Sequence, residues 1–133
     1  MKGFKTFIVE DHDTFRQTLL EGLSTRFPRM IFAEASTGQE VLSKVESFLP
    51  DLIFMDIRIP GESGLSLTPK IKARHPETLV IILTSYDLPE YRQAAYDRGA
   101  DDFLVKGSFT NEEVLNLVES ILSAKGFDSL GSK

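Results

Sequence analysis

Three acidic side chains, a hydroxyl and an amine stand at the ends of four apolar runs, and together they could carry phosphoryl chemistry. Glu10 and Asp11 follow Phe7-Ile8-Val9, Asp56 follows Leu52-Ile53-Phe54-Met55, Thr84 follows Leu79-Val80-Ile81-Ile82-Leu83, and Lys106 follows Phe103-Leu104-Val105. Carboxylates are the hard oxygen ligands that Mg²⁺ prefers, and an aspartate can also act as a nucleophile. A hydroxyl and an ammonium group can donate hydrogen bonds to phosphoryl oxygens. If the four runs end at one place, the set suits a magnesium ion and a phosphoryl group.

The apolar runs predict the elements that would bring these side chains together. Runs of this length, bounded by turn residues, are typical of buried parallel strands. We expect five strands, near residues 5–10, 30–35, 51–56, 78–84 and 101–105. Helical periodicity fills the gaps, and alternation of strands with helices implies parallel pairing through right-handed crossovers. The sequence therefore predicts an α/β fold with a doubly wound sheet, whose carboxyl edge is the usual place for ligands and chemistry.

Capping and breaker residues predict where several helices begin and end. Asp13 is expected to be the N-cap of the first helix, and Thr110, with Glu113 three residues later, that of the fifth. Gly99 is expected to end the fourth helix. Pro69 lies in the third and is tolerated if that helix begins late. The second helix is expected to present an apolar face made of Val41, Leu42, Val45 and Leu49.

Composition and charge narrow the class of protein. A chain of 133 residues is long enough for one domain with a real core. It has no cysteine, so neither disulfides nor thiolate chemistry is expected, which suits a reducing cytoplasm. No apolar stretch reaches the length of a membrane span, and an expected strand near the N-terminus argues against a signal peptide. A net charge of −5 argues against direct nucleic-acid binding, which normally uses a basic patch.

A larger set of motifs links these residues to a known family. The set comprises Glu10-Asp11, Met55-Asp56, Pro60, Gly64, Thr84-Ser85 and the run Gly99-Ala100-Asp101-Asp102-Phe103-Leu104-Val105-Lys106. Any single acid among them is more simply a turn or cap residue, but all of them occur in order along the chain. Over about residues 4 to 124 the chain resembles the receiver domain of two-component response regulators. The resemblance implies a flavodoxin-like (βα)5 fold with a parallel sheet of strand order 2-1-3-4-5.

The resemblance also assigns the residues of the site. It implies that Asp56 is the phosphoacceptor and that Mg²⁺ is the cofactor. Asp11 and Asp56 would bind the ion directly, Glu10 largely through water, and Arg58 through its backbone carbonyl. Lys106 would pair with Asp56 and then with a phosphoryl oxygen.

Two residues are expected to report phosphorylation to the rest of the domain. Thr84 would swing toward the phosphoryl group, and Phe103 would turn inward as the switch aromatic while also serving the core. Arg58 and Tyr86, two residues beyond Asp56 and Thr84, flank the site. They either tune the access of water, and hence the lifetime of the phosphate, or are plain exposed side chains.

The function that the resemblance implies is signalling rather than enzymatic turnover of a substrate. The domain would accept a phosphoryl group from a cognate histidine kinase or phosphotransfer protein, catalyse its own phosphoryl transfer and dephosphorylation, and switch an output. A phosphorylation-dependent homodimer is a further expected partner. Residues 1–125 would form the receiver domain, and residues 126–133 a flexible tail or the start of a linker.

The nature of the output is left open by the sequence. The run Glu10-Asp11-His12 followed by Phe15-Arg16 looks most like receivers that precede a LuxR-type helix-turn-helix domain, which would control transcription. No such domain is present here, so the chain could also be a complete single-domain regulator acting by protein contact. Gly107 follows Lys106 where receivers often have a cis proline. A cis bond to a non-proline residue costs roughly 2.5–4 kcal/mol, so the geometry of this bond is also left open.

Three unrelated folds with similar sheet edges fit less well. A phosphatase of the haloacid dehalogenase type, a remote alternative, needs a second acid two residues after the nucleophile, where this chain has Arg58. A flavodoxin needs a phosphate loop rich in Ser, Thr and Gly after the first strand, where this chain has the acidic run 10–13. The chain has no G-x-x-x-x-G-K-[ST] motif, which excludes a P-loop NTPase.

Overall fold

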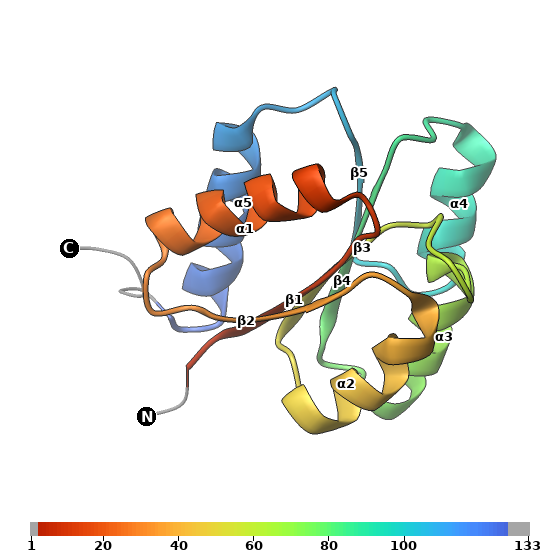
Figure 1. Cartoon of the computed structure of the whole chain (residues 1–133), viewed down its shortest axis with the longest axis horizontal. Coiled ribbons are helices and arrows are strands. Elements are labelled where there is room, and N and C mark those ends of the chain that lie inside the picture. Colours follow the sequence, from red (N-terminus) through yellow and green to blue (C-terminus); the bar gives the residue numbers. More distant parts are fainter. Residues whose placement is uncertain (1–2, 128–133) are drawn as a thin grey trace.

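Five parallel strands form the centre of the computed structural model, which describes residues 3–127 (Figure 1). They are β1 (Lys5–Val9), β2 (Ile31–Ala35), β3 (Leu52–Met55), β4 (Leu79–Thr84) and β5 (Asp102–Val105). Their order in the sheet is β2-β1-β3-β4-β5. The fold class and strand order expected from the sequence are confirmed, and every strand lies within one residue of its predicted bounds.

The strand register brings the ends of the central strands to one level. Val9 of β1 is opposite Ala35 of β2 on one side and Met55 of β3 on the other. The residues that follow, Glu10 and Asp56, therefore leave the sheet side by side. At the other side of β3, the ends of β4 and β5 are also in register, so all the candidate side chains belong to the same carboxyl edge.

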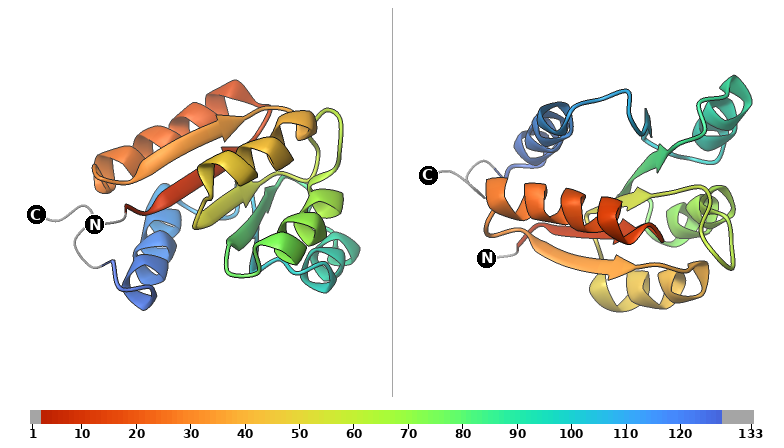
Figure 2. Two further views of the ribbon diagram at one scale, coloured as in Figure 1. Left: turned by 90° about the horizontal axis from the view of Figure 1, so that it is seen from below. Right: turned by 45° about the horizontal axis from the view of Figure 1, so that its top comes forward.

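Helices cover both faces of the sheet (Figures 1 and 2). They are α1 (Asp13–Arg26), the short 3₁₀ turn η1 (Gly38–Glu40), α2 (Val41–Phe48), α3 (Gly64–Arg74), α4 (Pro89–Asp97) and α5 (Asn111–Ala124). Helices α1 and α5 lie on one face, and α2, α3 and α4 lie on the other. No helix in the described part of the chain is long and apolar enough to cross a membrane.

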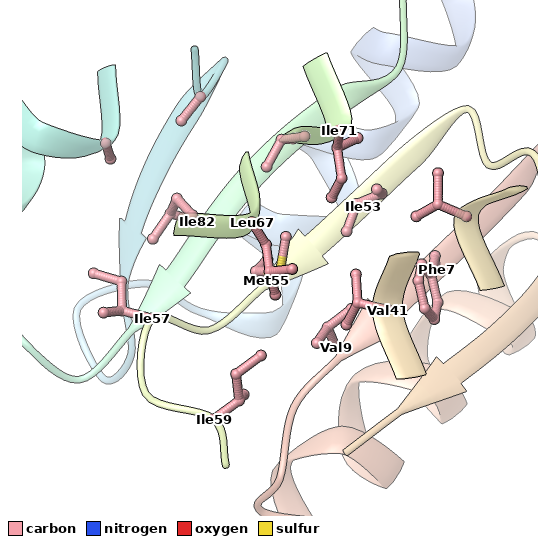
Figure 3. Close-up of a cluster of buried hydrophobic side chains, with 14 of the residues drawn as sticks. Phe7, Val9, Val41, Ile53, Met55, Ile57, Ile59, Leu67, Ile71 and Ile82 are labelled. Carbon is pink, nitrogen blue, oxygen red and sulfur yellow. The ribbon is translucent and has the colours of Figure 1, made fainter. Parts of the chain in front are cut away.

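Two hydrophobic cores result, because successive side chains of a strand point to opposite faces. Phe7 and Val9 of β1 join the core under α2 and α3, which also contains Ile53, Leu67 and Ile71 (Figure 3). The residue between them, Ile8, belongs to the core under α1 and α5. Burial on both faces explains why these strands read as continuous apolar runs and not as alternating ones.

The start of α1 differs from the sequence prediction. Asp13 was expected to be its N-cap, but His12 occupies that position, and its Nδ1 accepts a hydrogen bond from Phe15 N–H at 3.2 Å. Asp13 is instead the first helical residue, where its carboxylate accepts a hydrogen bond from Arg16 at 2.7 Å. An acid in the first turn is still favourable, because it faces the positive end of the helix dipole.

Two further local predictions were wrong, and two were right. Helix α3 begins at Gly64, capped by the Ser63 hydroxyl, so Pro69 lies inside the helix rather than near a late start. Leu49 was expected on the apolar face of the second helix, but it follows α2 in the left-handed region, with φ 55°, and is 53% exposed.

Thr110 caps α5 as predicted, with Glu113 completing the capping box. Gly99, with φ 102°, follows the C-cap of α4.

The chain beyond α5 is described as far as Phe127. Its backbone N–H donates to Leu122 at 2.7 Å, and its ring packs edge-on against Phe4 with centroids 5.3 Å apart. Phe127 therefore adds to the core, whereas the sequence placed it in a flexible tail. That prediction otherwise concerns residues 128–133, which lie outside the described residues.

Candidate functional site

The candidate acids meet at the centre of the carboxyl edge, because β1 and β3 are neighbouring inner strands. The backbone N–H of Glu10 donates to Ala35 at 2.9 Å, and that of Asp56 donates to Val9 at 3.1 Å, so the ladder continues into both acids. Glu10 and Asp56 are buried, at 2% and 6% exposure, and Asp11 is exposed. One carboxylate oxygen from each of the three lies within 4.8 Å of the others. The predicted convergence of Glu10, Asp11 and Asp56 is thus found.

Lys106 lies against two of these acids. Its Nζ is 2.6 Å from Glu10 Oε1 and 3.0 Å from Asp56 Oδ2, and it also lies over the Phe15 ring, 4.5 Å from the centroid. Burial lowers the pKa of Lys106, but its bonds to Glu10 and Asp56 outweigh burial, so the net pKa is raised. The ammonium group therefore stays charged and partly compensates the carboxylates.

The charge of Glu10 is compensated only in part. Burial raises its pKa, and the nearby Asp56 carboxylate adds to this effect. The bonds from Lys106 and from the His12 backbone N–H lower the pKa, but the net shift is still upward. Two ionised carboxylates side by side repel each other, and a divalent cation would relieve that repulsion.

Gly64, one of the motif residues, permits close packing below the nucleophile candidate. A Cβ at this position would collide with the backbone carbonyl oxygen of Asp56 and would lie 2.9 Å from Met55 Cγ. The N-terminus of α3 can approach the end of β3 only because this residue has no side chain.

Arg58 and Tyr86 form the opposite wall of the site. The Arg58 backbone N–H points to Asp56 Oδ1 at 3.4 Å, a long contact. Its guanidinium lies over the Tyr86 ring, 4.5 Å from the centroid, and Tyr86 in turn packs edge-on against Tyr91 of α4, 5.9 Å away. An open cleft of about 370 Å³ is lined by Arg58, Tyr86, Lys106 and the three acids. The other lining residues are His12, Phe15 and Ser85.

The two switch candidates lie behind this cleft rather than in it. Thr84 is fully buried, and its Oγ1 accepts a weak hydrogen bond from Tyr86 N–H at 3.3 Å. Ser85 lines the cleft instead. Phe103 is buried, at 3% exposure, and the Arg92 guanidinium of α4 covers its ring at 4.8 Å. The movements expected of Thr84 and Phe103 stay predictions.

The peptide bond between Lys106 and Gly107, whose geometry the sequence left open, is trans. No cis peptide bond occurs among residues 3–127. Gly107 has a φ of 88°, and a Cβ built on it would meet nothing within 4 Å. The glycine is needed here for its backbone conformation, because other residues adopt a positive φ only at a cost.

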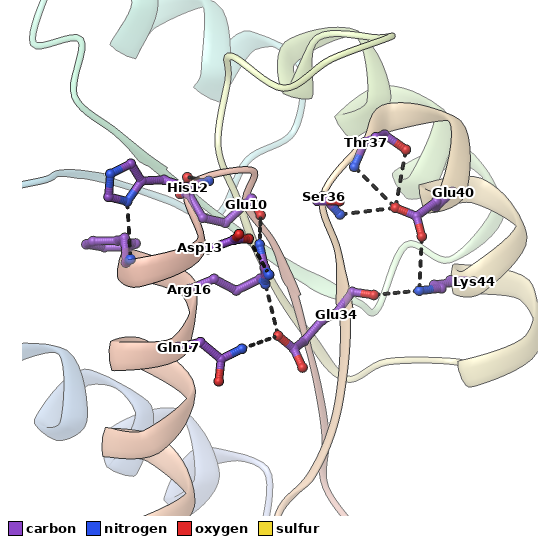
Figure 4. A network of polar contacts seen from close by, with 11 residues as sticks. Glu10, His12, Asp13, Arg16, Gln17, Glu34, Ser36, Thr37, Glu40 and Lys44 are labelled. Atoms are coloured by element: carbon purple, nitrogen blue, oxygen red, sulfur yellow. Dashed lines mark hydrogen bonds and ion pairs between the residues drawn. The ribbon is translucent and has the colours of Figure 1, made fainter.

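Arg16 was named in the sequence only as part of a family motif, and no role at the site was predicted for it. Its guanidinium bonds the backbone carbonyl of Glu10, the carboxylate of Asp13 and the carboxylate of Glu34, so it is tied to the loop that carries Glu10 (Figure 4). The sequence gave only one weak indication of such a role, because Arg16 is a basic residue one turn into a helix that begins beside the acids. Its partner Glu34 is remote in sequence, so the contact depends on the pairing of β1 with β2.

Comparison with known proteins identifies the family. The model of the response regulator receiver domain matches residues 6–119, most of the chain. The chain belongs to this family. Receiver domains are signalling domains of two-component systems, and phosphorylation on an aspartate is general among them.

Characterised relatives of this receiver domain are regulators of greater length. The DNA-binding transcriptional regulator NtrC of Salmonella typhimurium is 36% identical over 117 residues, covering 88% of this chain and 24% of the relative. The oxygen regulatory protein NreC of Staphylococcus haemolyticus is 33% identical over 124 residues, covering 92% of this chain and 57% of the relative. The chain thus spans between about a quarter and just over half of these proteins.

Solved receiver structures share the fold of this one. The signal receiver domain of a NarL response regulator from Mycobacterium tuberculosis superposes with a TM-score of 0.81 at 26% identity, covering 92% of this chain and 98% of that one. The beryllofluoride-activated receiver domain of DrrB gives a TM-score of 0.77 at 27% identity, covering 92% and 99%.

Proposed function

We propose that Asp56 is the phosphoacceptor of this receiver domain. Its carboxylate lies at the centre of the carboxyl edge, is 3.0 Å from the Lys106 ammonium, and lines the open cleft. Attack of a carboxylate oxygen on the phosphorus of a phosphohistidine would form the O–P bond and break the N–P bond. The electron pair of that bond would leave with the donor's imidazole, and Asp56 would become an acyl phosphate.

The acid cluster would hold Mg²⁺ during this step. Three carboxylates that converge within 4.8 Å, one of them exposed, form the donor set that a hard cation retaining several waters prefers. Asp11 and Asp56 would bind directly, Glu10 largely through water, and Arg58 through its backbone carbonyl. When bound, the ion would neutralise negative charge on the phosphoryl oxygens.

Lys106 would hold the nucleophile before transfer and the phosphoryl group afterwards. Its ammonium already bonds Asp56, so a small movement would bring it to a phosphoryl oxygen. The hydroxyl of Thr84 would bond another oxygen after leaving its place behind Tyr86. Each such charge-assisted bond contributes about 1.5–3 kcal/mol. Thr84 and Phe103 would then form the conformational switch, and self-catalysed dephosphorylation would reset it.

The output proposed for the whole protein is control of transcription through a DNA-binding domain. It is suggested by the names of NtrC, a DNA-binding transcriptional regulator, and NreC, an oxygen regulatory protein. A cytoplasmic histidine kinase or phosphotransfer protein would be the donor, and phosphorylated copies could form a homodimer. The second candidate, a single-domain regulator acting by protein contact, would need the same site and switch.

Phosphorylation of purified protein tests the assignment of Asp56. We expect wild type, incubated with Mg²⁺ and acetyl phosphate or a phosphorylated histidine kinase, to gain the mass of one phosphoryl group. Asp56→Asn should gain none, whereas Asp87→Asn, a neutralised exposed acid in the loop before α4, should react as wild type does. Incorporation by Asp56→Asn at the normal yield would refute the assignment.

A further inference from the structure

Arg16 makes three polar contacts beside Glu10, one of the acids of the cluster (Figure 4). One guanidinium nitrogen, Nη1, donates to the Glu10 backbone carbonyl at 2.7 Å. The second, Nη2, donates to the Asp13 carboxylate at 2.7 Å, and Nε donates to the Glu34 carboxylate at 2.9 Å. The side chain is only 14% exposed. A guanidinium is a rigid planar fork, so three bonds in different directions fix its position and that of its partners.

The carbonyl that Arg16 holds belongs to the peptide between Glu10 and Asp11. The other end of Glu10 is already fixed, because its N–H donates to Ala35 at 2.9 Å. The Glu10 side chain is held by Lys106 and by the His12 N–H, at 2.6 and 2.9 Å. Asp11 has an exposed side chain, so its direction depends mainly on the backbone that carries it.

Arg16 is itself anchored to a strand that does not contribute an acid to the site. Glu34, on edge strand β2, also accepts a bond from Gln17 at 3.1 Å, and its backbone carbonyl accepts one from Lys44 of α2 at 2.6 Å. The contacts therefore link α1, β2 and α2 to the loop after β1. Without such a frame, three like charges within 4.8 Å would tend to turn apart.

We propose that Arg16 is a positioning residue for the divalent-cation site, fixing the Glu10–Asp11 peptide so that both carboxylates converge with Asp56. The inference rests on the proposed function of the acid cluster. Cation binding then does not have to order this peptide. Ordering the backbone of one residue is equivalent to roughly a tenfold change in a binding constant. We therefore expect Mg²⁺ to bind about tenfold more weakly when the contact is removed.

The sign of the effect separates positioning from electrostatics. Arg16 is a cation close to the site, so Coulomb's law alone says that its removal should strengthen the binding of a second cation. A positioning role demands the reverse. The matched control is Arg26 on the same helix, which also pairs with two carboxylates, Glu112 and Glu119, but is remote from the loop.

The experiment is titration of the full chain with Mg²⁺ at constant ionic strength, followed by amide NMR shifts. We expect Arg16→Met to bind about tenfold more weakly, Arg16→Lys to bind more weakly although its charge is kept, and Arg26→Met to bind as wild type does. Unchanged or tighter binding by Arg16→Met would overturn the inference. If Arg16→Met does not fold, Arg16→Lys decides, and binding equal to wild type would then overturn it.

Failure of the inference can be told apart from failure of the cation site. Asp11→Asn and Asp56→Asn should each weaken Mg²⁺ binding severely if the acid cluster is the site. If they do so and the Arg16 variants do not, only the positioning role is wrong. If neither acid matters, the site itself lies elsewhere, and the role of Arg16 falls with it.

Discussion

The two loops that flank the site are built in opposite ways. The loop after β1 is held on both sides of Asp11, through the Glu10 backbone N–H and carbonyl, the Glu10 carboxylate, and the His12 side chain that caps α1. The loop after β4 is exposed throughout, from Ser85 to Leu88. Leu88 is the N-cap of α4 and offers no side-chain hydrogen bond, and Tyr86 N–H bonds Thr84 only at 3.3 Å.

The difference separates two tasks within one small edge. Clustered carboxylates must be held in place, because they repel each other and a divalent cation needs them together. A switch must have a second arrangement of similar free energy, which a region with few buried contacts supplies more readily. We therefore expect the acid side of the site, around Glu10 and Asp11, to stay fixed, and the hydroxyl side, Thr84 and the loop after β4, to rearrange.

The largest effect on the proposed switch is expected from removal of the Thr84 hydroxyl, on the hydroxyl side of the site. Beryllofluoride stands in for the phosphoryl group on Asp56, and we expect it to shift NMR signals of Phe103 and α5 in wild type. Thr84→Ala should still bind beryllofluoride but lose a bond worth about 1.5–3 kcal/mol to the active state, so these distant shifts should shrink. Equal shifts in both proteins would rule out a relay through Thr84.

Gly64→Ala should break the fixed side of the site. The new Cβ must displace the Asp56 carbonyl or move α3, and overpacking of this kind costs typically about 1–3 kcal/mol. We expect lower stability in urea and slower phosphorylation. Gly107→Ala is the control: it strains a positive φ in open space, so it should lose less stability. A Gly64→Ala variant as stable as wild type would show that α3 and the end of β3 can move apart without loss of stability.

Glu10→Gln should show what the fixed arrangement costs. The pKa of Glu10 is raised by burial, so its charged form destabilises the folded state, and stability without cation should rise as pH falls through that raised pKa. The neutral variant should therefore be more stable than wild type at neutral pH without cation, on the order of 1 kcal/mol. Saturating Mg²⁺ should stabilise wild type more than the variant. A less stable variant under cation-free conditions would contradict this account.

Arg58→Met should loosen only the hydroxyl side of the site, in the loop after β4. The variant removes the guanidinium from the Tyr86 ring, and we expect amide exchange between Ser85 and Leu88 to accelerate about two- to fivefold, the equivalent of one exposed cation–π contact. Exchange at Glu10 and His12 should be unaltered. Acceleration of equal size in both loops would mean that they are not independent.

The smallest effect is expected far from both loops. Arg74 and then His75 lower the pKa of Glu46 to about 2. A lowered pKa means that the contribution to stability is present above about pH 4.5 and is lost as pH falls toward 2. Because Glu46 is exposed, solvent screens the gain. Urea unfolding of wild type and Glu46→Gln should differ slightly at pH 6 and converge near pH 2. A difference in unfolding free energy that grows as pH falls would contradict the lowered pKa of Glu46.

Much of this architecture could be predicted, because it depends on local patterns. Continuous apolar runs located four of the five strands, and the polar residue ending each run located the edge. The convergence of Glu10, Asp11, Asp56 and Lys106 followed from parallel pairing, since every strand ends on the same side. Residue roles came from the family resemblance and not from the spacing.

The errors have a common physical origin in contacts that a single sequence does not reveal. Asp13 and His12 are both acceptable caps, and the competing bond from Arg16 to Asp13 decides between them. Leu49 fits an apolar helix face, but α2 ends one residue earlier. Arg16 and Arg92 owe their positions to Glu34 and Phe103, each remote in sequence, so their contacts become visible only once the strands are paired.

The order of the strands has a consequence for the growing chain during synthesis. The lysine that compensates the acids lies 50 residues after Asp56 and directly follows the last strand, β5, which is the edge strand beside β4. The three carboxylates leave the ribosome well before it. Until β5 joins the sheet, the acids of the nascent chain would lie together without the ammonium group of Lys106. The final strand therefore completes the charge balance as well as the fold.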